Sequence, residues 1–423
     1  MTSGIIRAFQ FIRFQAVHRR SRSVIKRWQD RHLRTIVAHA FENVPVYREL
    51  YTSAGVAPGD IQTTEDIGML PITRKQTFIG RPFDEYIDNS QPVRQVWETT
   101  SGTSGVPFRF MLGRNALEER YLNSICFRFI TWLQPWRMDF ARMKVARIKI
   151  RSHTSDFRMF IPVADFLANP EEAVNKLAAF EPYVLESYTS MLLLLANTLE
   201  HNPELPRLKP SFVVSFGEVL TDAARAYLRQ TFGCDVYDRY GIEEMSVVAS
   251  ECARHDGQHV HSESIIAEIV DESGNPLPYG SYGRVILTDL TNVYMPFIRY
   301  DTGDHGRLSW EPCACGLQTP RLWFEGRYAA FVTLGGKKIH HLEFDAALDT
   351  FMNVIRQYQV AKVSESHIEI RITTGDQYAS QDEERILTAI RPLVGDGISL
   401  SVVGMDEIPV TPRGKCKILV DES

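Results

Sequence analysis

A hydroxyl-rich stretch near residue 100 is the strongest local signal for chemistry in this sequence. It has the sequence Thr-Thr-Ser-Gly-Thr-Ser-Gly over residues 99–105 and is followed by Val-Pro. Because its two glycines have no Cβ atoms, backbone N–H groups and hydroxyls can wrap around an anion. It lacks the Gly-Lys-Ser/Thr ending of a Walker loop. By composition it is either a loop that binds the phosphates of a nucleoside triphosphate or a flexible Ser/Gly linker.

Four other segments carry residue types that act on phosphates, sugars or metal ions. Each alone has an ordinary structural explanation, such as an acidic pair at a helix start or an aspartate in a tight turn. Their order along one chain, after the hydroxyl-rich stretch, is the stronger signal. The segments are Tyr240-Gly241-Ile242-Glu243-Glu244, Arg299-Tyr300-Asp301-Thr302-Gly303-Asp304, Gly326-Arg327 and Pro412-Arg413-Gly414-Lys415.

Together these segments resemble the adenylate-forming superfamily of acyl-CoA ligases, adenylation domains and luciferases, from about residue 31 to the C-terminus. The phrase His-Ala-Phe-Glu-Asn-Val-Pro-Val-Tyr at residues 39–47 is similar to the phenylacetate-CoA ligase branch, including its capsular-polysaccharide relatives. The resemblance implies an α/β fold, with a large N-terminal adenylate-forming domain of mixed sheets and helices and a small mobile α+β lid. It also implies ATP and Mg²⁺ as cofactors.

The resemblance implies that the nucleotide is bound by several separate segments. The hydroxyl-rich loop would hold the β and γ phosphates, Asp304 would accept hydrogen bonds from both ribose hydroxyls, and Tyr240 would stack on the adenine. Gly217 and Glu218 match the family segment that lines the base. The implied nucleotide-binding residues are Thr100, Ser101, Gly102, Thr103, Ser104, Gly105, Gly217, Glu218, Tyr240, Gly241, Asp304 and Arg327.

Two charged residues are implied to be catalytic. Glu244 resembles the magnesium ligand of the family, and carboxylate oxygens are preferred ligands of that ion. Lys415 matches the terminal Gly-Lys motif and would bring a mobile positive charge to the α-phosphate. A carboxylate is a poor electrophile, so the implied reaction first joins the acid to AMP and expels pyrophosphate.

The implied function is adenylation of an organic, possibly aromatic, carboxylic acid, followed by transfer to a thiol, with coenzyme A as the expected acceptor. One alternative is amide formation with an amine, such as an amino acid or amino sugar, in surface-polysaccharide or secondary metabolism. A second alternative is a non-catalytic nucleotide-binding homologue. Two departures from the family pattern motivate it: Glu243 replaces a usual Ser or Thr, and residues 328–330 lack the usual hinge aspartate.

A cysteine pair, Cys313 and Cys315, indicates a metal site. Upstream lies Cys252, followed by three histidines, His255, His259 and His261. Three thiols and one imidazole would close a tetrahedral structural zinc site, whereas the alternative is reduced cysteines packed as small apolar side chains. Some members of the resembling branch carry a comparable site whose histidine follows a glycine by two. On that resemblance the expected zinc ligands are Cys252, His259, Cys313 and Cys315.

Composition limits the class of protein. The length of 423 residues predicts two or three domains, and 44% hydrophobic with 23% charged residues excludes a disordered chain. A formal net charge of −5 gives no reason to expect a nucleic-acid partner. Six cysteines are too few for a disulfide scaffold, which favours a reducing compartment, the cytoplasm.

The N-terminus is basic and its apolar residues recur at helical spacing. Ile5, Phe9 and Ile12 follow this spacing, and several arginines come before any acidic residue. No apolar stretch reaches the roughly 18 residues that a membrane-spanning helix needs. The segment is therefore either a helix docked on its own domain or a weak membrane-surface contact through residues 1–24.

Patterning predicts three regions: a basic amphipathic segment over 1–30, a large ATP- and substrate-binding domain over 31–326, and a small lid over 327–423. Residues 31–90 are expected to form a helix followed by irregular connections. In the core, strands at 213–216, 265–270 and 284–287 alternate with helices at 171–180 and 190–201. In the lid, helices are expected at 342–351 and 382–393, and strands at 367–372 and 399–403.

Overall fold

The computed structural model describes most of the chain. The chain divides into two compact units. One unit comprises residues 1–138 and 239–325, and the other comprises residues 139–238 and 326–423. We call these unit 1 and unit 2. Every structural statement below concerns the described residues, which are 18–90, 95–99, 108–113, 116, 144–149, 158–327, 331–334, 336–348, 351, 354–375, 378–406, 408 and 418–423.

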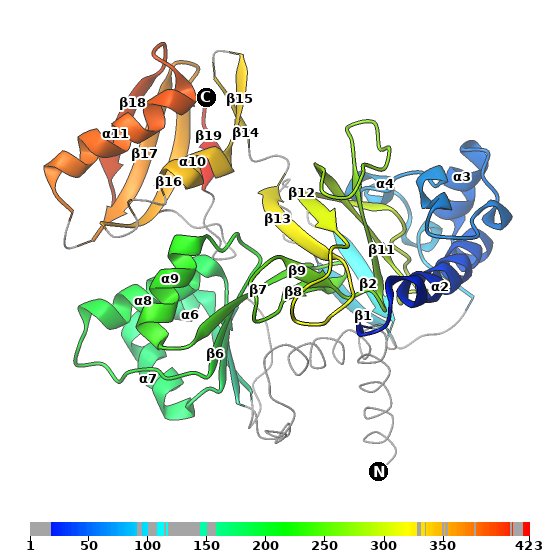
Figure 1. Cartoon of the computed structure of the whole chain (residues 1–423), viewed down its shortest axis with the longest axis horizontal. Coiled ribbons are helices and arrows are strands. Elements are labelled where there is room, and N and C mark those ends of the chain that lie inside the picture. Colours follow the sequence, from blue (N-terminus) through cyan, green and yellow to red (C-terminus); the bar gives the residue numbers. More distant parts are fainter. Residues whose placement is uncertain are drawn as a thin grey trace. The chain divides into compact units, whose positions relative to one another are not determined.

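Unit 1 begins with two helices, coloured blue in Figure 1. The first, α2 (Arg22–Asn43), buries side chains spaced three or four residues apart, among them Leu33 and Ile36. The helix ends at Asn43. The next residue, Val44, precedes a proline and therefore avoids the helical conformation. Pro45 then opens α3 (Pro45–Ser53), where the fixed φ of proline suits the first helical turn.

The rest of unit 1 is mainly antiparallel sheet. Its strands are hydrogen-bonded in the order β10-β11-β12-β13-β9-β8-β7, and β1 pairs with β2 in a separate hairpin. A core of buried side chains joins α2 and α3 to these strands. The elements are η1 (Pro58–Asp60), η2 (Asp66–Met69), α4 (Lys75–Phe78), η3 (Phe83–Glu85), β1 (Gln95–Thr99), β2 (Arg109–Gly113), β7 (Asp235–Ile242), β8 (Ser246–Glu251), β9 (Gln258–Val260), β10 (Ile265–Val270), β11 (Tyr282–Asp289), β12 (Tyr300–Ser309) and β13 (Arg321–Arg327).

The first part of unit 2 has strands in the order β6-β5-β3-β4, and these strands run parallel, with helices between them in the chain. Two of the helices have clear end signals. The Asn169 side chain accepts a hydrogen bond from Glu172 N at the start of α7, and α9 ends at Gly233 in the left-handed conformation. The elements are β3 (Val145–Lys149), β4 (Arg158–Pro162), α6 (Val163–Ala168), α7 (Pro170–Phe180), β5 (Val184–Ser187), α8 (Thr189–His201), β6 (Phe212–Phe216) and α9 (Asp222–Phe232).

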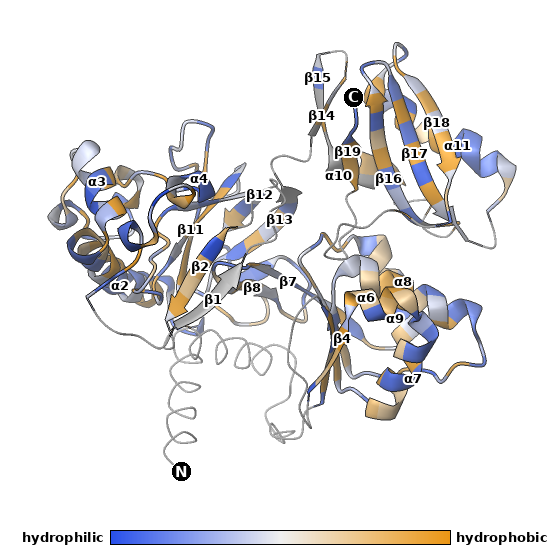
Figure 2. Cartoon of the chain, turned by 180° about the vertical axis from the view of Figure 1, so that it is seen from behind, coloured by the Kyte–Doolittle hydropathy of each residue, from blue (hydrophilic) through white to orange (hydrophobic). Residues whose placement is uncertain are grey.

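The C-terminal residues of unit 2 form a small α+β module. Its four-stranded sheet has the order β18-β17-β16-β19, and α11 crosses it (Figure 1). Figure 2 shows hydrophobic and hydrophilic residues alternating along β16 and β17, as expected for strands with one covered face. Ile386 and Ile390 of α11 pack in one cluster with Ile368 and Ile370. The elements are β14 (Phe331–Leu334), β15 (Lys337–His340), α10 (His341–Leu348), β16 (Ile355–Ser364), β17 (His367–Thr374), α11 (Ser380–Val394), β18 (Ser399–Gly404) and β19 (Leu419–Asp421).

The helices and strands expected from patterning are present, with their ends shifted by a few residues. Elements that patterning did not predict include α9, the ten-residue strand β16, and β12, where the Thr-Gly-Asp sequence resembles a turn. The helix expected from residue 31 begins at Arg22, so α2 runs across the boundary expected at residue 30. The three-region division stays a prediction. In the described part of the chain, no helix combines the length and apolar character needed to cross a membrane.

The described end of the N-terminal segment docks on unit 1. His18 is fully buried and forms an ion pair with the buried Glu263. The Arg22 guanidinium lies 5.0 Å from the centre of the Tyr279 ring and 4.9 Å from that of Trp310. Residues 18–30 thus match the expectation of a docked helix. Residues 1–17 lie outside the described residues, and membrane contact stays a prediction.

Arg299 connects the segment before β12 to two other segments of unit 1, at residues 68–70 and at Gly274. It is buried, has a positive φ of 47°, and its guanidinium donates to the carbonyls of Gly68, Leu70 and Gly274. Its charge is paired with Glu268, with 3.1 Å between Nη2 and Oε1. Burial raises the pKa of Glu268, although Arg299 opposes that rise. The ion pair therefore fixes the chain direction at the start of β12.

We expect Arg299→Met to lower the free energy of unfolding by about 3–5 kcal/mol, because it leaves the Glu268 carboxyl buried without its cation. Arg81→Met is the matched control, since Arg81 pairs with the exposed Glu49 and should contribute less than about 1 kcal/mol. Urea unfolding measures both variants. Equal destabilisation in the two would contradict this account of the buried pair.

Candidate functional site

The structure describes only part of the predicted nucleotide site. Tyr240, Gly241, Glu244 and Asp304 belong to unit 1, whereas Gly217 and Glu218 belong to unit 2. Arg327 is the last residue of β13, and only its backbone is described. The predicted residues that lie outside the described part are Thr100, Ser101, Gly102, Thr103, Ser104, Gly105 and Lys415.

The strands on either side of the hydroxyl-rich stretch are described. β1 and β2 are antiparallel neighbours, and Thr99 at the end of β1 pairs with Arg109 at the start of β2. The described residues on the two sides of the predicted phosphate loop therefore lie on neighbouring strands.

Two tyrosine hydroxyls bind the two acidic residues of the predicted nucleotide site that lie in unit 1, Asp304 and Glu244. The Tyr240 hydroxyl donates to Asp304 Oδ2 over 2.6 Å, and the Tyr300 hydroxyl donates to Glu244 Oε1 over 2.8 Å. All four side chains are buried, with at most 7% of their surface exposed. The Tyr240 ring packs against Phe324, with 4.9 Å between ring centres. Tyr240 thus has a hydroxyl contact that its predicted role on adenine did not include.

A bulge in β12 positions Asp304. Arg284 of β11 lies opposite His305, and Ile286 lies opposite Asp301, so three residues of β12 face the single residue between them. The Thr302 hydroxyl donates to Val285 O over 2.9 Å and accepts from Asp304 N over 3.1 Å. Gly303 adopts a φ of +73°, which favours glycine. A bulge redirects side chains locally, and Asp304 is the last of the three residues in this one.

A second irregularity shapes the turn that carries Glu244. The register of β7 and β8 shifts between Tyr240 and Gly241. A Cβ atom at Gly241 would lie 2.2 Å from Ser246 O, so only glycine fits between the two strands. In the turn that follows, Glu243 is exposed while Glu244 is buried. The buried Glu244 carboxylate is therefore fixed by its neighbours, and Glu243, the departure from the family pattern, points to solvent.

Glu218 lies in unit 2, just after β6. Its Oε2 accepts from Ser190 N over 2.7 Å and its Oε1 accepts from the Ser190 hydroxyl over 3.0 Å. Ser190 belongs to the first turn of α8, where a negative charge interacts favourably with the helix dipole. Gly217 has a φ of +74°, which turns the chain between β6 and Glu218. These contacts give Glu218 a structural role, and its predicted role beside the base stays untested.

The four predicted zinc ligands come together in unit 1. The ligand atoms of Cys252, His259, Cys313 and Cys315 all lie within 4.8 Å of one another. Cys252 Sγ and Cys313 Sγ are 3.7 Å apart, too far for a disulfide and close to the roughly 3.8 Å expected for two sulfurs on one tetrahedral zinc ion. His259 Nε2 lies 3.3 Å from Cys315 Sγ. This donor set fits a closed zinc site.

Further contacts orient the ligands. The other ring nitrogen of His259, Nδ1, lies 3.2 Å from the Thr319 hydroxyl, which fixes the ring direction. Hydrogen bonds from Cys252 and from His259 lower the pKa of the Cys315 thiol to about 3. The hydrogen bond to Cys315 raises the pKa of Cys252, and burial raises the pKa of Cys313. A thiolate is the form that ligates a metal. His259 is the histidine of this set, as the resemblance to the branch implied. Neither His255 nor His261 belongs to it.

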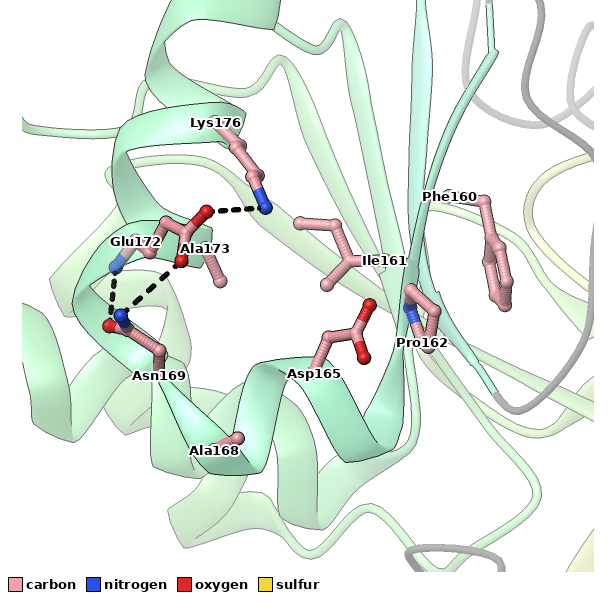
Figure 3. A pocket seen from close by; sticks show the side chains of 9 residues that line it. All are labelled: Phe160, Ile161, Pro162, Asp165, Ala168, Asn169, Glu172, Ala173 and Lys176. Carbon is pink, nitrogen blue, oxygen red and sulfur yellow. Dashed lines mark hydrogen bonds and ion pairs between the residues drawn. The ribbon is translucent and has the colours of Figure 1, made fainter.

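A pocket of about 310 Å³ lies in unit 2, at the end of β4 beside α6 and α7 (Figure 3). Its polar groups bind one another: Lys176 Nζ is 2.7 Å from Glu172 Oε1, and Asn169 Nδ2 donates to Glu172 Oε2 over 3.3 Å. No residue of the predicted nucleotide or zinc sites is among those lining it. This pocket is therefore not part of the predicted nucleotide site or of the predicted zinc site.

Sequence reasoning gave no role to Tyr300, Thr302 or Phe324, each of which supports a predicted residue. The strand that carries Tyr300 was not expected from the sequence, and a bulge interrupts its alternation before Asp304. The contact between Tyr300 and Glu244 joins residues 56 positions apart, and no local pattern reveals it.

Comparisons with known proteins agree with the resemblance inferred from the motifs. Residues 331–422 match the family model described as the CapK C-terminal domain. The phenylacetate-coenzyme A ligase of Thermus thermophilus is 24% identical over 436 residues, which span 95% of this chain and 97% of that protein. The similarity therefore extends over nearly the whole length of both proteins.

Solved structures share the fold. A 2-hydroxyisobutyryl-CoA ligase, in a postadenylation state with an acyl-AMP, aligns with a TM-score of 0.81 and 19% identity over 96% of this chain and 91% of that one. ATP-bound MatB from Rhodopseudomonas palustris aligns with a TM-score of 0.55 and 19% identity over 76% of this chain and 66% of that one. These comparisons confirm the α/β fold class and the predicted resemblance to phenylacetate-CoA ligases. The named relatives are ligases, in agreement with the prediction of an adenylate-forming ligase.

We expect Gly241→Ala to reduce stability by about 1–3 kcal/mol, since its new Cβ must push backbone atoms of β8 away. Because the same turn carries Glu244, activity that depends on Glu244 should fall as well. Gly59→Ala is the control, because no atom lies within 4 Å of a Cβ placed there. Thermal unfolding compares the variants, and unchanged stability in Gly241→Ala would contradict the close approach.

Proposed function

We propose that this chain uses ATP to adenylate an organic carboxylic acid, releases pyrophosphate, and transfers the acyl group to the thiol of coenzyme A. The main support is the pair of buried carboxylates, Glu244 and Asp304, each bound by a tyrosine hydroxyl at the motif positions. Similarity to a phenylacetate-coenzyme A ligase over 95% of the chain supports the same reaction.

In the proposed first step, a carboxylate oxygen of the acid attacks the α-phosphorus of ATP. The bond from that phosphorus to the bridging oxygen breaks, and the electron pair leaves with pyrophosphate. The Asp304 carboxylate would accept hydrogen bonds from the ribose hydroxyls, and the hydroxyl-rich loop would bind the β and γ phosphates. Lys415 would offset negative charge at the α-phosphate. Magnesium, held by Glu244, would neutralise phosphate charge.

In the proposed second step, the thiol sulfur attacks the acyl carbon and its proton passes to solvent. The bond from the acyl carbon to the phosphate oxygen breaks, and AMP departs with the electron pair. The acceptor is proposed from the names of the relatives, which are coenzyme A ligases. The same names differ in the acid, phenylacetate in one and 2-hydroxyisobutyrate in another. An aromatic acid is our first candidate because the relative that is similar over nearly the whole chain is named for phenylacetate.

We also propose that Cys252, His259, Cys313 and Cys315 hold a structural zinc ion. The four donors close a tetrahedral set, and a set without an open position serves structure rather than catalysis. Such an ion would connect the loop after β8 to the loop between β12 and β13. Reduced thiols require a reducing compartment, so a cytoplasmic location is part of this proposal.

The proposed function predicts pyrophosphate release with ATP, Mg²⁺ and at least one acid from a panel of aromatic and aliphatic carboxylic acids. Lys415→Ala should slow the release by about 100-fold or more, because the positive charge at the α-phosphate is lost. Lys417→Ala is the matched control, and its activity should remain near that of the unmodified protein. A coupled pyrophosphate assay gives the rates.

Three outcomes would change the account. If none of the acids in the panel leads to pyrophosphate release, the result would favour a non-catalytic nucleotide-binding protein. Loss of activity in Lys417→Ala, with Lys415→Ala unaffected, would assign the lysine role to position 417. Product analysis by mass spectrometry with coenzyme A and with amines separates thioester from amide formation, and a sole amide product would contradict the thiol acceptor.

The zinc proposal predicts about one equivalent of zinc per chain by elemental analysis. The double variant Cys313→Ser and Cys315→Ser should lose the metal and unfold at a lower temperature, because two of the four ligands are gone. Cys234→Ser is the control, since Cys234 lies outside the cluster. A metal-free preparation with full stability would contradict the site.

A further inference from the structure

The hydrogen bonds of the two tyrosines are reciprocal between two segments of unit 1. Tyr240 lies on β7 and donates to Asp304 of β12. Tyr300 lies on β12 and donates to Glu244 in the turn after β7. Each segment therefore supplies a phenol to the carboxylate of the other.

Burial makes these bonds important. Asp304 is 3% exposed and Glu244 is 7% exposed, so neither carboxylate is fully hydrated. A buried carboxylate is strongly disfavoured unless donors replace the lost water. A phenol is a suitable donor because it carries one O–H group and stays neutral at physiological pH. Each tyrosine thus replaces part of the hydration that its carboxyl group loses on burial.

The tyrosine rings are themselves held in place. The Tyr240 ring lies 4.9 Å from Phe324, and the Tyr300 ring lies 5.1 Å from Phe297 with an edge-on geometry. A tyrosine has only two side-chain torsions, so ring packing fixes the position of its hydroxyl. The hydroxyl in turn fixes one oxygen of the carboxylate that it binds.

We infer that Tyr300 and Tyr240 are positioning residues: Tyr300 orients Glu244 for the magnesium ion, and Tyr240 orients Asp304 for the ribose. This inference rests on the proposed function of these two acids. It gives Tyr240 a role through its hydroxyl in addition to the role expected for its ring. Because the two bonds cross between the same segments, they also hold the turn after β7 against β12.

The test uses the full-length chain with Tyr300→Phe and Tyr240→Phe, each of which removes a single oxygen. Two quantities are measured by calorimetry: the Mg²⁺ concentration that gives half-maximal ATP binding, and the ratio of affinities for ATP and 2′-deoxyATP. The same quantities are measured from pyrophosphate release wherever an acid is found. Tyr47→Phe is the matched control, because Tyr47 is buried and its hydroxyl binds the backbone: it donates to Pro296 O over 2.6 Å and accepts from Ile298 N over 3.1 Å.

Tyr300→Phe should raise the half-maximal Mg²⁺ concentration by about 10-fold, the expected effect of losing a hydrogen bond to a charged group, with little change in the 2′-deoxyATP ratio. Tyr240→Phe should lower the preference for ATP over 2′-deoxyATP by about 10-fold, with a smaller change in Mg²⁺ dependence. Tyr47→Phe should reduce thermal stability and leave both quantities unchanged. A general loss of structure would instead alter all three variants in the same way.

A double-mutant cycle tests whether Tyr300 acts through Glu244. If it does, Tyr300→Phe added to Glu244→Gln causes little further change in Mg²⁺ dependence. Additive effects would overturn the inference, as would unchanged Mg²⁺ dependence and unchanged sugar preference in the single variants. Those results would leave the proposed function intact. If the unmodified protein binds ATP but releases no pyrophosphate with any acid, the proposed function is contradicted. The binding data then still decide the inference. Absence of ATP binding would overturn both.

Discussion

The carboxyl groups of Glu244 and Asp304 are kept almost entirely out of water, and this requires compensating hydrogen bonds. Two phenols, those of Tyr300 and Tyr240, contribute to this compensation from segments more than fifty residues away. The local irregularities of unit 1 serve the same arrangement. The bulge in β12 sets the position of Asp304, and the glycine at 241 allows the close approach of β7 and β8 before the turn that carries Glu244.

The buried ion pair of Arg299 extends this arrangement to the N-terminal part of unit 1. Arg299 donates to carbonyls at residues 68, 70 and 274 and pairs with Glu268, directly before β12 begins. The left-handed conformation of a non-glycine residue is unfavourable, and its many hydrogen bonds offset that strain. The direction of the chain entering Tyr300 therefore depends on contacts with distant loops.

Several elements of this account could be predicted from the sequence, and others could not. The cysteine cluster was predicted because thiols and imidazoles are rare and their chemistry is specific, although about sixty residues separate Cys252 from Cys313. The motif order predicted the resemblance to adenylate-forming ligases, and the similarity to a phenylacetate-coenzyme A ligase agrees with it. The donors to Glu244 and Asp304 were not predicted, because a tyrosine is common in cores and only tertiary packing selects its partner. β12 was missed for a related reason, since Thr-Gly-Asp favours a turn and pairing with β11 overrides that preference.

The central claim is that Glu244 and Asp304 bind one magnesium nucleotide that activates an acid. A crystal structure of the protein with Mg²⁺ and a non-hydrolysable ATP analogue tests it most directly. The account predicts the ribose hydroxyls within hydrogen-bond distance of the Asp304 carboxylate and the metal ion coordinated on the side of Glu244. A nucleotide bound elsewhere, with neither the ribose near Asp304 nor the metal ion near Glu244, would contradict it.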